Sequence, residues 1–276
     1  DALPNLKNLQ VDSYGESSTG LLRKDLETLS SMWTQMGMDL KILQNGSEFN
    51  VKEWFGVSVD DEIGRVTKLD WSGKSIQDFK KKLAEVDEED DEKDGAEPGE
   101  KDEEVKKGKE VEKDEEGEEN DENSSAYAAA ESELKGKGEK LLGQIPDIIG
   151  RLDELQYLNL SQNSLNGTIP ELKDLQALTT LHLEDNQLLG SIPPNLGFCV
   201  SLNELHLEKN KLSGDVPPEL GGVYGHEGCQ KLAKLYVQEN ESGLDKLPEE
   251  VKSIKWLNLV HLNKKDDVEI VGDLGE

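Results

Sequence analysis

The stretch LTTLHLEDNQLLGSIP, residues 178–193, is followed by LNELHLEKNKLSGDVP, residues 202–217. The two segments align without a gap. Leucines, an asparagine, a glycine and a proline recur at the same places, and each segment has a histidine between two leucines. A repeat of this length is typical of solenoid proteins, in which each copy buries its apolar face against its neighbours. The duplicated segment therefore predicts a repeat architecture.

The same frame extends in both directions along the chain. The first apolar residues of five frames stand at 155, 178, 202, 232 and 254, with spacings of 23, 24, 30 and 22 residues. The longest spacing contains GGVYGHEG, residues 221–228, which we interpret as a loop. The fifth frame, predicted at Ile254, Leu257, Leu259 and Leu262, lacks the asparagine.

Elementary physical chemistry explains the residues of the frame. Alternating leucines form a short strand with one buried face, and such a strand needs stacked neighbours to be stable. The asparagine stands where the chain must bend, and its amide can hydrogen-bond buried backbone groups of adjacent turns. We therefore predict a ladder formed by Asn163, Asn186, Asn210 and Asn240.

The frame resembles the plant-type leucine-rich repeat, LxxLxxLxLxxNxLxGxIPxxL, over residues 141–263. The resemblance is strongest at GTIPELKDL, GSIPPNLGFCVSL and LSGDVPPEL. It implies an α/β solenoid that is curved and has a parallel sheet on its concave face. It also implies that the chain is not an enzyme and that it recognises a protein or peptide, which is the usual role of this family.

An earlier segment, residues 54–79, is similar to the start of such arrays in eukaryotic microbes. Its first repeat uses Val66, Leu69, Trp71 and Ile76, with Lys74 in place of the asparagine. Before it, Leu22, Leu26, Leu29, Trp33 and Met36 have helical spacing and predict a helix that caps the open end of the core. The predicted organisation is 1–53 N-terminal helical cap region, 54–79 first strand and atypical first repeat, 80–140 acidic disordered insertion, 141–263 leucine-rich repeats, and 264–276 C-terminal cap or tail.

Charge is concentrated in one tract. The chain has a formal net charge of −29, and residues 85–122 hold 22 acidic and 6 basic residues. A tract with so few apolar side chains is expected to be disordered. The acidic balance argues against nucleic-acid binding, and no apolar run approaches the roughly 20 residues of a membrane span. The tract is either a solvated spacer or an arm that binds basic proteins.

The concave face supplies the candidate binding site. The residue between the two strand leucines points away from the core, so we expect Asp70, Asn159, His182, His206, Tyr236 and Asn258 to form one column. Histidine, tyrosine and tryptophan there suit a contact surface. The predicted partner-binding residues are Tyr157, Asn159, His182, Glu184, Glu204, His206, Glu208, Tyr236, Trp256 and Asn258.

We predict no catalytic residue, no cofactor and no metal ligand. Zinc needs three or four converging ligands, and we expect parallel side chains on neighbouring strands to diverge from any common point. Cys199 and Cys229 each precede a first leucine by three residues, so we expect them on adjacent turns of the core, with a disulfide left open.

Two alternatives to recognition through the concave face remain from the sequence. One is a chaperone-like binder of basic proteins acting through residues 85–122, and strong salt sensitivity would distinguish it. The other is the ligand-sensing ectodomain fragment of a receptor. Five N-glycosylation patterns occur, but the repeat consensus itself generates those at 159 and 166. We therefore favour a cytoplasmic over an extracellular location.

Overall fold

The computed structural model describes residues 16–38, 54–60, 62–79, 81, 140–223, 225–263 and 268–269. By its internal contacts the chain divides into one unit, Asp1–Gln77 with Gly138–Glu276, and a second unit, Asp78–Lys137. The predicted disorder of the acidic tract, residues 85–122, lies outside the described residues.

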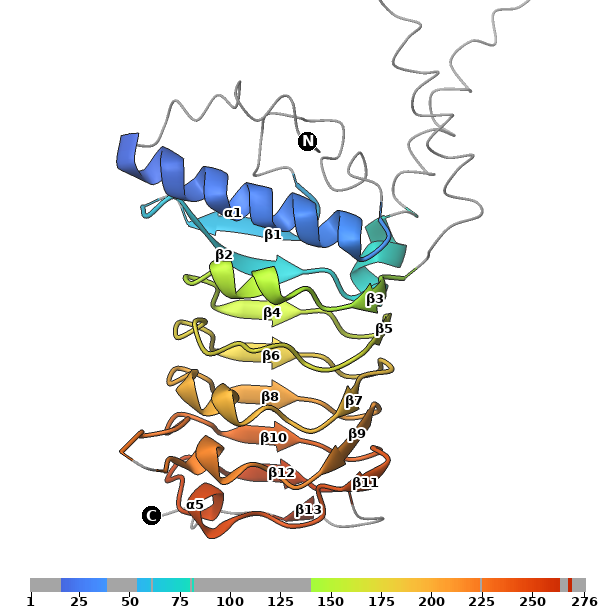
Figure 1. The fold of residues 1–276 in the computed structure, drawn as a ribbon, viewed down its shortest axis with the longest axis vertical. Coiled ribbons are helices and arrows are strands. Elements are labelled where there is room, and N and C mark those ends of the chain that lie inside the picture. The colour runs from blue at the N-terminus through green and yellow to red at the C-terminus, as the bar shows by residue number, and fades with distance from the viewer. Residues whose placement is uncertain are drawn as a thin grey trace, which may run out of the picture. The chain divides into compact units, whose positions relative to one another are not determined.

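The first unit is built on an eight-stranded sheet with the order β1-β2-β4-β6-β8-β10-β12-β13 (Figure 1). The six strands from β2 to β12 pair in parallel, and the two edge strands, β1 and β13, pair antiparallel to their neighbours. The strands are β1 (Val57–Asp60), β2 (Arg65–Asp70), β4 (Tyr157–Asn159), β6 (Thr180–His182), β8 (Glu204–His206), β10 (Lys234–Tyr236), β12 (Leu259–His261) and β13 (Val268–Glu269).

The short strands of the array share one burial pattern over their three residues. The central residue is buried and the two flanking residues are half-buried in β4, β6, β8, β10 and β12. Successive side chains of a strand point to opposite faces, so the central leucines enter the core and their neighbours form the other face of the sheet. The structure thus confirms an α/β leucine-rich-repeat solenoid with a parallel sheet.

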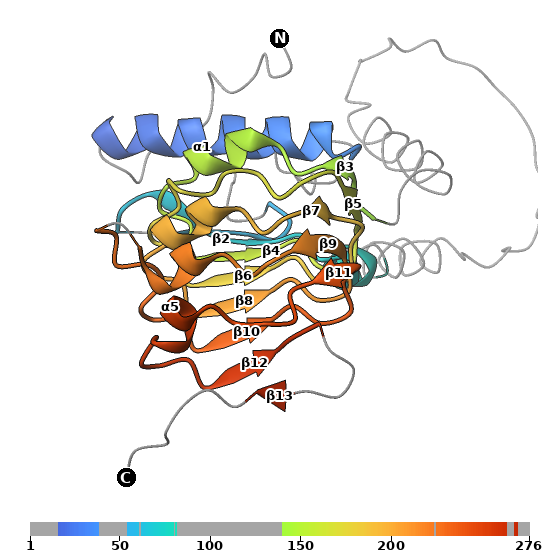
Figure 2. The ribbon, with the colours of Figure 1, turned by 60° about the horizontal axis from the view of Figure 1, so that its bottom comes forward.

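Short strands and single-turn helices form the other side of the same unit (Figure 2). The strands are β3 (Leu142–Gln144), β5 (Ser164–Asn166), β7 (Leu189–Gly190), β9 (Lys211–Gly214) and β11 (Ser242–Gly243). The helices are η3 (Asp147–Arg151), η4 (Pro194–Phe198), η5 (Pro218–Gly221) and α5 (Glu249–Lys252). A proline precedes each of these helices and fixes the backbone angle from which a helix can start.

The glycine of the fourth repeat, Gly243, is required by close backbone packing. A Cβ atom on Gly243 would lie 2.0 Å from the carbonyl oxygen of Gly214 on the preceding turn. Gly243 also has a φ of +73°, which disfavours any residue with a side chain.

The asparagine ladder is confirmed. The amide nitrogen of Asn186 donates to the carbonyl oxygens of Leu160 on the preceding turn and Leu183 on its own turn, at 3.0 and 3.1 Å. Its Oδ1 accepts from the backbone N–H of Leu165 at 3.0 Å. Asn163, Asn210 and Asn240 make equivalent bonds. The ladder therefore satisfies backbone groups that the turns leave without strand partners.

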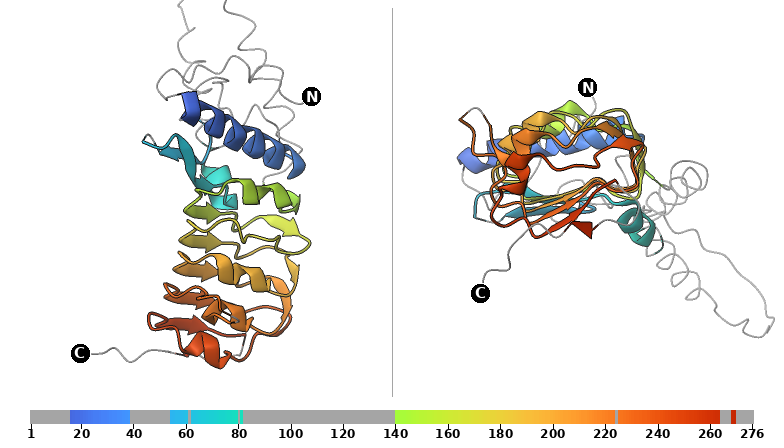
Figure 3. Two further views of the ribbon diagram at one scale, coloured as in Figure 1. Left: turned by 60° about the vertical axis from the view of Figure 1, so that its left-hand side comes forward. Right: turned by 90° about the horizontal axis from the view of Figure 1, so that it is seen from below.

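The helix α1 (Glu16–Gln35) covers the N-terminal end of the core (Figures 1 and 3). Leu26, Leu29, Trp33 and Met36 are fully buried, and the rings of Trp33 and Trp71 lie 4.7 Å apart in an edge-on arrangement. The apolar face of the helix thus packs on the first repeat, as the predicted cap requires.

A buried ion pair joins the cap to the array. Asp25 of α1 accepts two hydrogen bonds from the guanidinium of Arg65, at 2.9 and 3.0 Å, and one from the backbone N–H of Val66 at 3.0 Å. Arg65 also pairs with Asp153. Because Asp25 is fully buried, its partners must replace the water that a free carboxylate would bind.

The predicted frame of the fifth repeat is wrong by three residues. Val260 pairs with Leu235, and His261 pairs with Tyr236, so the buried strand residue is Val260 and the first leucine is Leu257. Ile254 instead occupies the place that Cys229 has one turn earlier. This frame buries Leu257, Val260 and Leu262, and it leaves Leu259 half-buried at the strand edge.

The C-terminal end of the sheet has its own edge strand. β13 pairs with β12, with Val260 opposite Glu269 and His261 opposite Val268. Residues 264–267 and 270–276 of the predicted cap or tail lie outside the described residues. Within the part of the chain that is described, no helix has both the length and the apolar character that crossing a bilayer requires.

Candidate functional site

One column of ring side chains crosses four neighbouring strands on the face of the sheet opposite the core. His182, His206, Tyr236 and His261 are register partners, and we name them the ring column. From His182 to His261, the centroids of successive rings lie 4.3, 4.3 and 4.9 Å apart, and adjacent rings are stacked. In-register parallel strands about 4.8 Å apart hold equivalent side chains at stacking distance, so the repeat itself builds the column.

Tyr157 and Asn159 extend this surface toward β2. The Tyr157 ring lies 5.8 Å from that of His182, and the Asn159 amide nitrogen donates to the Tyr157 hydroxyl at 3.2 Å. Lys68 lies over the Tyr157 ring, with Nζ 4.8 Å from its centroid. The predicted contact residues on β4, β6, β8 and β10 are thus brought together on one surface.

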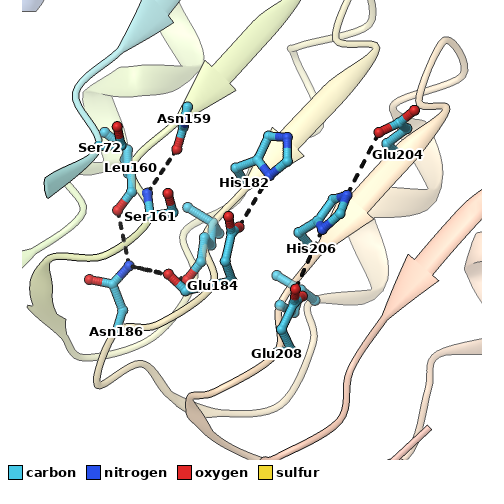
Figure 4. Close-up of polar contacts among 12 residues, drawn as sticks. Ser72, Asn159, Leu160, Ser161, His182, Glu184, Asn186, Glu204, His206 and Glu208 are labelled. Atoms are coloured by element: carbon cyan, nitrogen blue, oxygen red, sulfur yellow. Dashed lines mark hydrogen bonds and ion pairs between the residues drawn. The ribbon is translucent and has the colours of Figure 1, made fainter. Parts of the chain in front are cut away.

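Carboxylates lie on both sides of the His206 imidazole and on one side of that of His182 (Figure 4). Glu184 Oε2 lies 3.2 Å from His182 Nδ1, and Glu208 Oε1 lies 3.5 Å from His206 Nδ1. On the opposite side, Glu204 Oε2 lies 3.7 Å from His206 Nε2. The other oxygen of Glu204 accepts from Lys234 Nζ at 2.8 Å. The stacked rings therefore have negative charge beside their edges.

These contacts change the proton affinities of two partners. Burial disfavours the charged imidazole of His182, but the hydrogen bond and negative charge of Glu184 outweigh burial and raise its pKa. Burial likewise raises the pKa of Glu184, and its bond to His182 more than offsets that effect, so its pKa is lowered. Both shifts favour a charged imidazolium–carboxylate pair.

Several polar atoms of this surface have unused hydrogen-bonding capacity. His206 Nε2, Glu208 Oε2 and Gln238 Oε1 are buried and have no hydrogen-bond partner among the described residues. Leaving such groups unpaired costs free energy. The three atoms lie beside the ring column and are enclosed by the folded chain, so a further molecule can reach them only when neighbouring side chains move.

Two predicted contact residues lie elsewhere. Trp256 and Asn258 precede β12 and are exposed, and His261 takes the place in the ring column that was expected of Asn258. Trp256 is 60% exposed, with Lys255 Nζ 5.0 Å from its ring centroid. A signal for the correct frame was present, because the first leucine follows the repeat proline by nine residues both at Pro193–Leu202 and at Pro248–Leu257.

The two cysteines are free and buried in the core. Cys199 Sγ donates to the carbonyl oxygen of Leu172, and Cys229 Sγ donates to that of Leu196, each at 3.2 Å. Burial raises the pKa of Cys199 to about 12 and also raises that of Cys229. A nucleophilic cysteine needs an accessible thiolate, so this environment gives neither residue that role.

One group of side chains is close enough to bind a metal ion. Candidate ligand atoms of His182, Glu184 and His206 all lie within 4.8 Å of one another. The widest of these separations exceeds the roughly 3.3–3.6 Å between ligand atoms of tetrahedral zinc, so the expectation that parallel side chains do not converge readily stays a prediction.

Comparisons with known proteins agree with this architecture. A sequence model of the Leucine Rich Repeat family matches residues 154–173, 177–199 and 201–223. The chain is 45% identical over 58 residues to a probable leucine-rich-repeat receptor-like serine/threonine-protein kinase, and 41% identical over 59 residues to Phytosulfokine receptor 1, both from Arabidopsis thaliana. Each match covers 21% of this chain and 6% of the relative, so the chain aligns with only a small part of these proteins.

A solved structure extends the likeness beyond the matched repeats. The ectodomain of the receptor kinase SOBIR1 from Arabidopsis thaliana has a TM-score of 0.50 and 21% sequence identity, covering 86% of this chain and 90% of that chain. At that identity the similarity shows the fold. Together with the repeats and their ladder, the matches show that residues 154–223 are leucine-rich repeats similar to those of plant proteins.

Proposed function

We propose that the chain recognises a protein or peptide, without enzymatic activity, through the ring column and the carboxylates beside it. The observation that carries the proposal is a stack of His182, His206 and Tyr236 flanked by carboxylates. Ring side chains supply contact area at low entropic cost, and the carboxylates beside them supply specificity.

The charges of the surface favour one class of partner. Beside the ring column there are three carboxylates, Glu184, Glu204 and Glu208, and Lys234 is the cation paired with one of them. An arginine or lysine side chain can stack on a ring face while its charged end bonds a carboxylate. We therefore propose an extended segment that presents basic side chains as the partner.

The relatives support recognition over catalysis. Both matched proteins carry the word receptor in their names, and the similarity to the kinase relative does not cover its catalytic domain. A ligand-sensing part of a receptor is a specific form of the same proposal, because it too binds its ligand through repeats.

Affinity capture from the native cell extract tests the proposal. The bait is the full chain, compared with His206→Ala and with His226→Ala. His226 is exposed and lies away from the ring column, with its ring centroid 4.5 Å from that of Phe198. His226→Ala therefore controls for the loss of an imidazole. We expect His206→Ala to lose partners that His226→Ala retains. Equal capture by the two variants would contradict recognition by the ring column.

The acidic tract supports a second candidate function, the binding of basic proteins. Residues 85–122 carry a net charge of −16, from 22 acidic and 6 basic residues. A chain lacking this tract is therefore a fourth bait. Partners lost on its removal, retained by His206→Ala and released by salt would belong to the tract, because exposed charges are screened within about 10 Å at 0.1 M salt.

A further inference from the structure

The candidate ligand atoms of His182, Glu184 and His206 come from two adjacent strands whose spacing is fixed by the sheet. His182 and His206 are register partners on β6 and β8, and Glu184 follows β6 by two residues. All three ligand atoms lie within 4.8 Å of one another. We propose that these residues bind a divalent transition-metal ion, with zinc as the ion to test.

The donor set suits zinc better than calcium or magnesium. Two imidazole nitrogens and one glutamate oxygen are a known zinc set, whereas calcium and magnesium prefer oxygen ligands alone. Tetrahedral bonds of 2.0–2.2 Å place ligand atoms about 3.3–3.6 Å apart. The widest separation here therefore needs to close by about 1.2–1.5 Å. Rotation of these partly exposed side chains can supply that movement while the paired strands stay in place.

Further carboxylates lie close to the candidate ligands. A metal-binding imidazole usually donates its second N–H to a carboxylate, which orients the ring. Glu204 lies on the side where that acceptor is needed, with Oε2 3.7 Å from His206 Nε2, and a small movement would bring it into hydrogen-bond range; Lys234 Nζ donates to its other oxygen at 2.8 Å. Glu208 Oε2 is buried without a hydrogen-bond partner beside the same ring. A metal ion displaces the proton from a histidine that it binds. Three carboxylates and one lysine then leave two excess negative charges, which a divalent cation neutralises.

The three ligands leave a fourth coordination position open. The side chains of His182, Glu184 and His206 are 20%, 20% and 16% exposed, so the open position lies toward solvent. Such a position accepts water or a ligand from another molecule. Metal binding and the proposed recognition of a protein or peptide use the same side chains, so each is tested by a measurement that leaves the other out.

Equilibrium dialysis of the full chain against zinc, followed by elemental analysis, tests the proposal. Excess magnesium in the buffer occupies the acidic tract, whose oxygen-rich side chains bind hard cations. We expect one more zinc ion per chain in the wild type and in His226→Ala than in His182→Ala. Cobalt substitution gives a second readout, because a tetrahedral site produces a visible absorption band that His182→Ala should lose.

Glu204→Gln separates a positioning carboxylate from a structural one. We expect zinc binding to weaken by roughly 10- to 100-fold, while thermal unfolding without metal stays close to that of the wild type. Equal zinc content in the wild type and in a folded His182→Ala variant would overturn the proposal, as would an equal loss in His226→Ala. The measurement contains no partner, so its failure leaves the proposed recognition untouched.

Discussion

His182 and His206 stack with their ring centroids 4.3 Å apart because they are register partners on adjacent parallel strands. The repeat places them there, and no irregular loop is needed to bring them together. The same register adds Tyr236 and His261, so the array produces a continuous surface of rings from residues that lie far apart in the sequence.

The asparagine ladder should be a major source of stability. Asn186→Ala leaves a backbone N–H and several carbonyl groups in the core without their partner, at about 1–3 kcal/mol for each group left unsatisfied. We expect the free energy of unfolding to fall by about 2–4 kcal/mol in a denaturant titration. The neighbouring Gln187→Ala, at an exposed position, should stay within about 0.5 kcal/mol of the wild type. Similar losses in both variants would contradict the role of the ladder.

The buried ion pair should fix the N-terminal cap to the array. Asp25→Asn leaves the guanidinium of Arg65 buried without its main counter-charge, and we expect a loss of about 3 kcal/mol in unfolding free energy. Glu27→Gln removes the same charge from an exposed position of the same helix and serves as the control. A cap that packs only through apolar contacts would make the two variants equally stable.

The Arg65–Asp153 pair should make stability depend on acid pH. Burial raises the pKa of Asp153, but the hydrogen bond and charge of Arg65 outweigh it, so the folded-state pKa lies below the ordinary value of 3.8. The folded state then holds this carboxylate ionised more strongly than the unfolded state does. Its contribution is present at neutral pH and is lost as pH falls through the lowered pKa.

Asp153→Asn measures that contribution. Because the Asp153 side chain is 48% exposed, we expect a difference from the wild type of no more than about 1 kcal/mol at pH 7. Thermal unfolding from pH 7 to pH 2 should show the two proteins converging in acid. A difference that stays constant over this range would mean that the charge of Asp153 contributes nothing.

The cysteines should be unreactive until the protein unfolds. Both thiols are buried and have raised pKa values, so little thiolate is available to a thiol-specific reagent at pH 8. We expect no labelling of the folded chain and two labelled thiols in denaturant without a reducing agent. Labelling of fewer than two in denaturant would show that the pair is oxidised.

Much of the solenoid could be predicted from the sequence, because the same apolar strand residues and the same asparagine recur in successive repeats. Leu181 and Leu205 mark buried strand centres, and Asn186 and Asn210 mark the turns. The fifth repeat was harder, since Ile254–Leu257–Leu259 and Leu257–Val260–Leu262 both fit the same apolar spacing. Burial of Val260 and the strand pairing decide for the second frame.

Other features depend on side-chain geometry that spacing does not contain. The pairing of Asp25 with Arg65 joins residues 40 positions apart, and neither stands in a recognisable motif. The approach of Glu184 to both imidazoles likewise depends on side-chain rotation, so the sequence indicates neighbouring histidines and does not fix the distances between their candidate ligand atoms.

A peptide-display selection tests recognition by the ring column most directly. The full chain is the target, and folded His206→Ala protein removes peptides that bind elsewhere, including those held by the acidic tract. We predict that the remaining peptides share basic side chains, bind His226→Ala as well as the wild type, and lose affinity for Tyr236→Ala. Peptides that bind His206→Ala and the wild type equally, with none left after the counter-selection, would contradict the account.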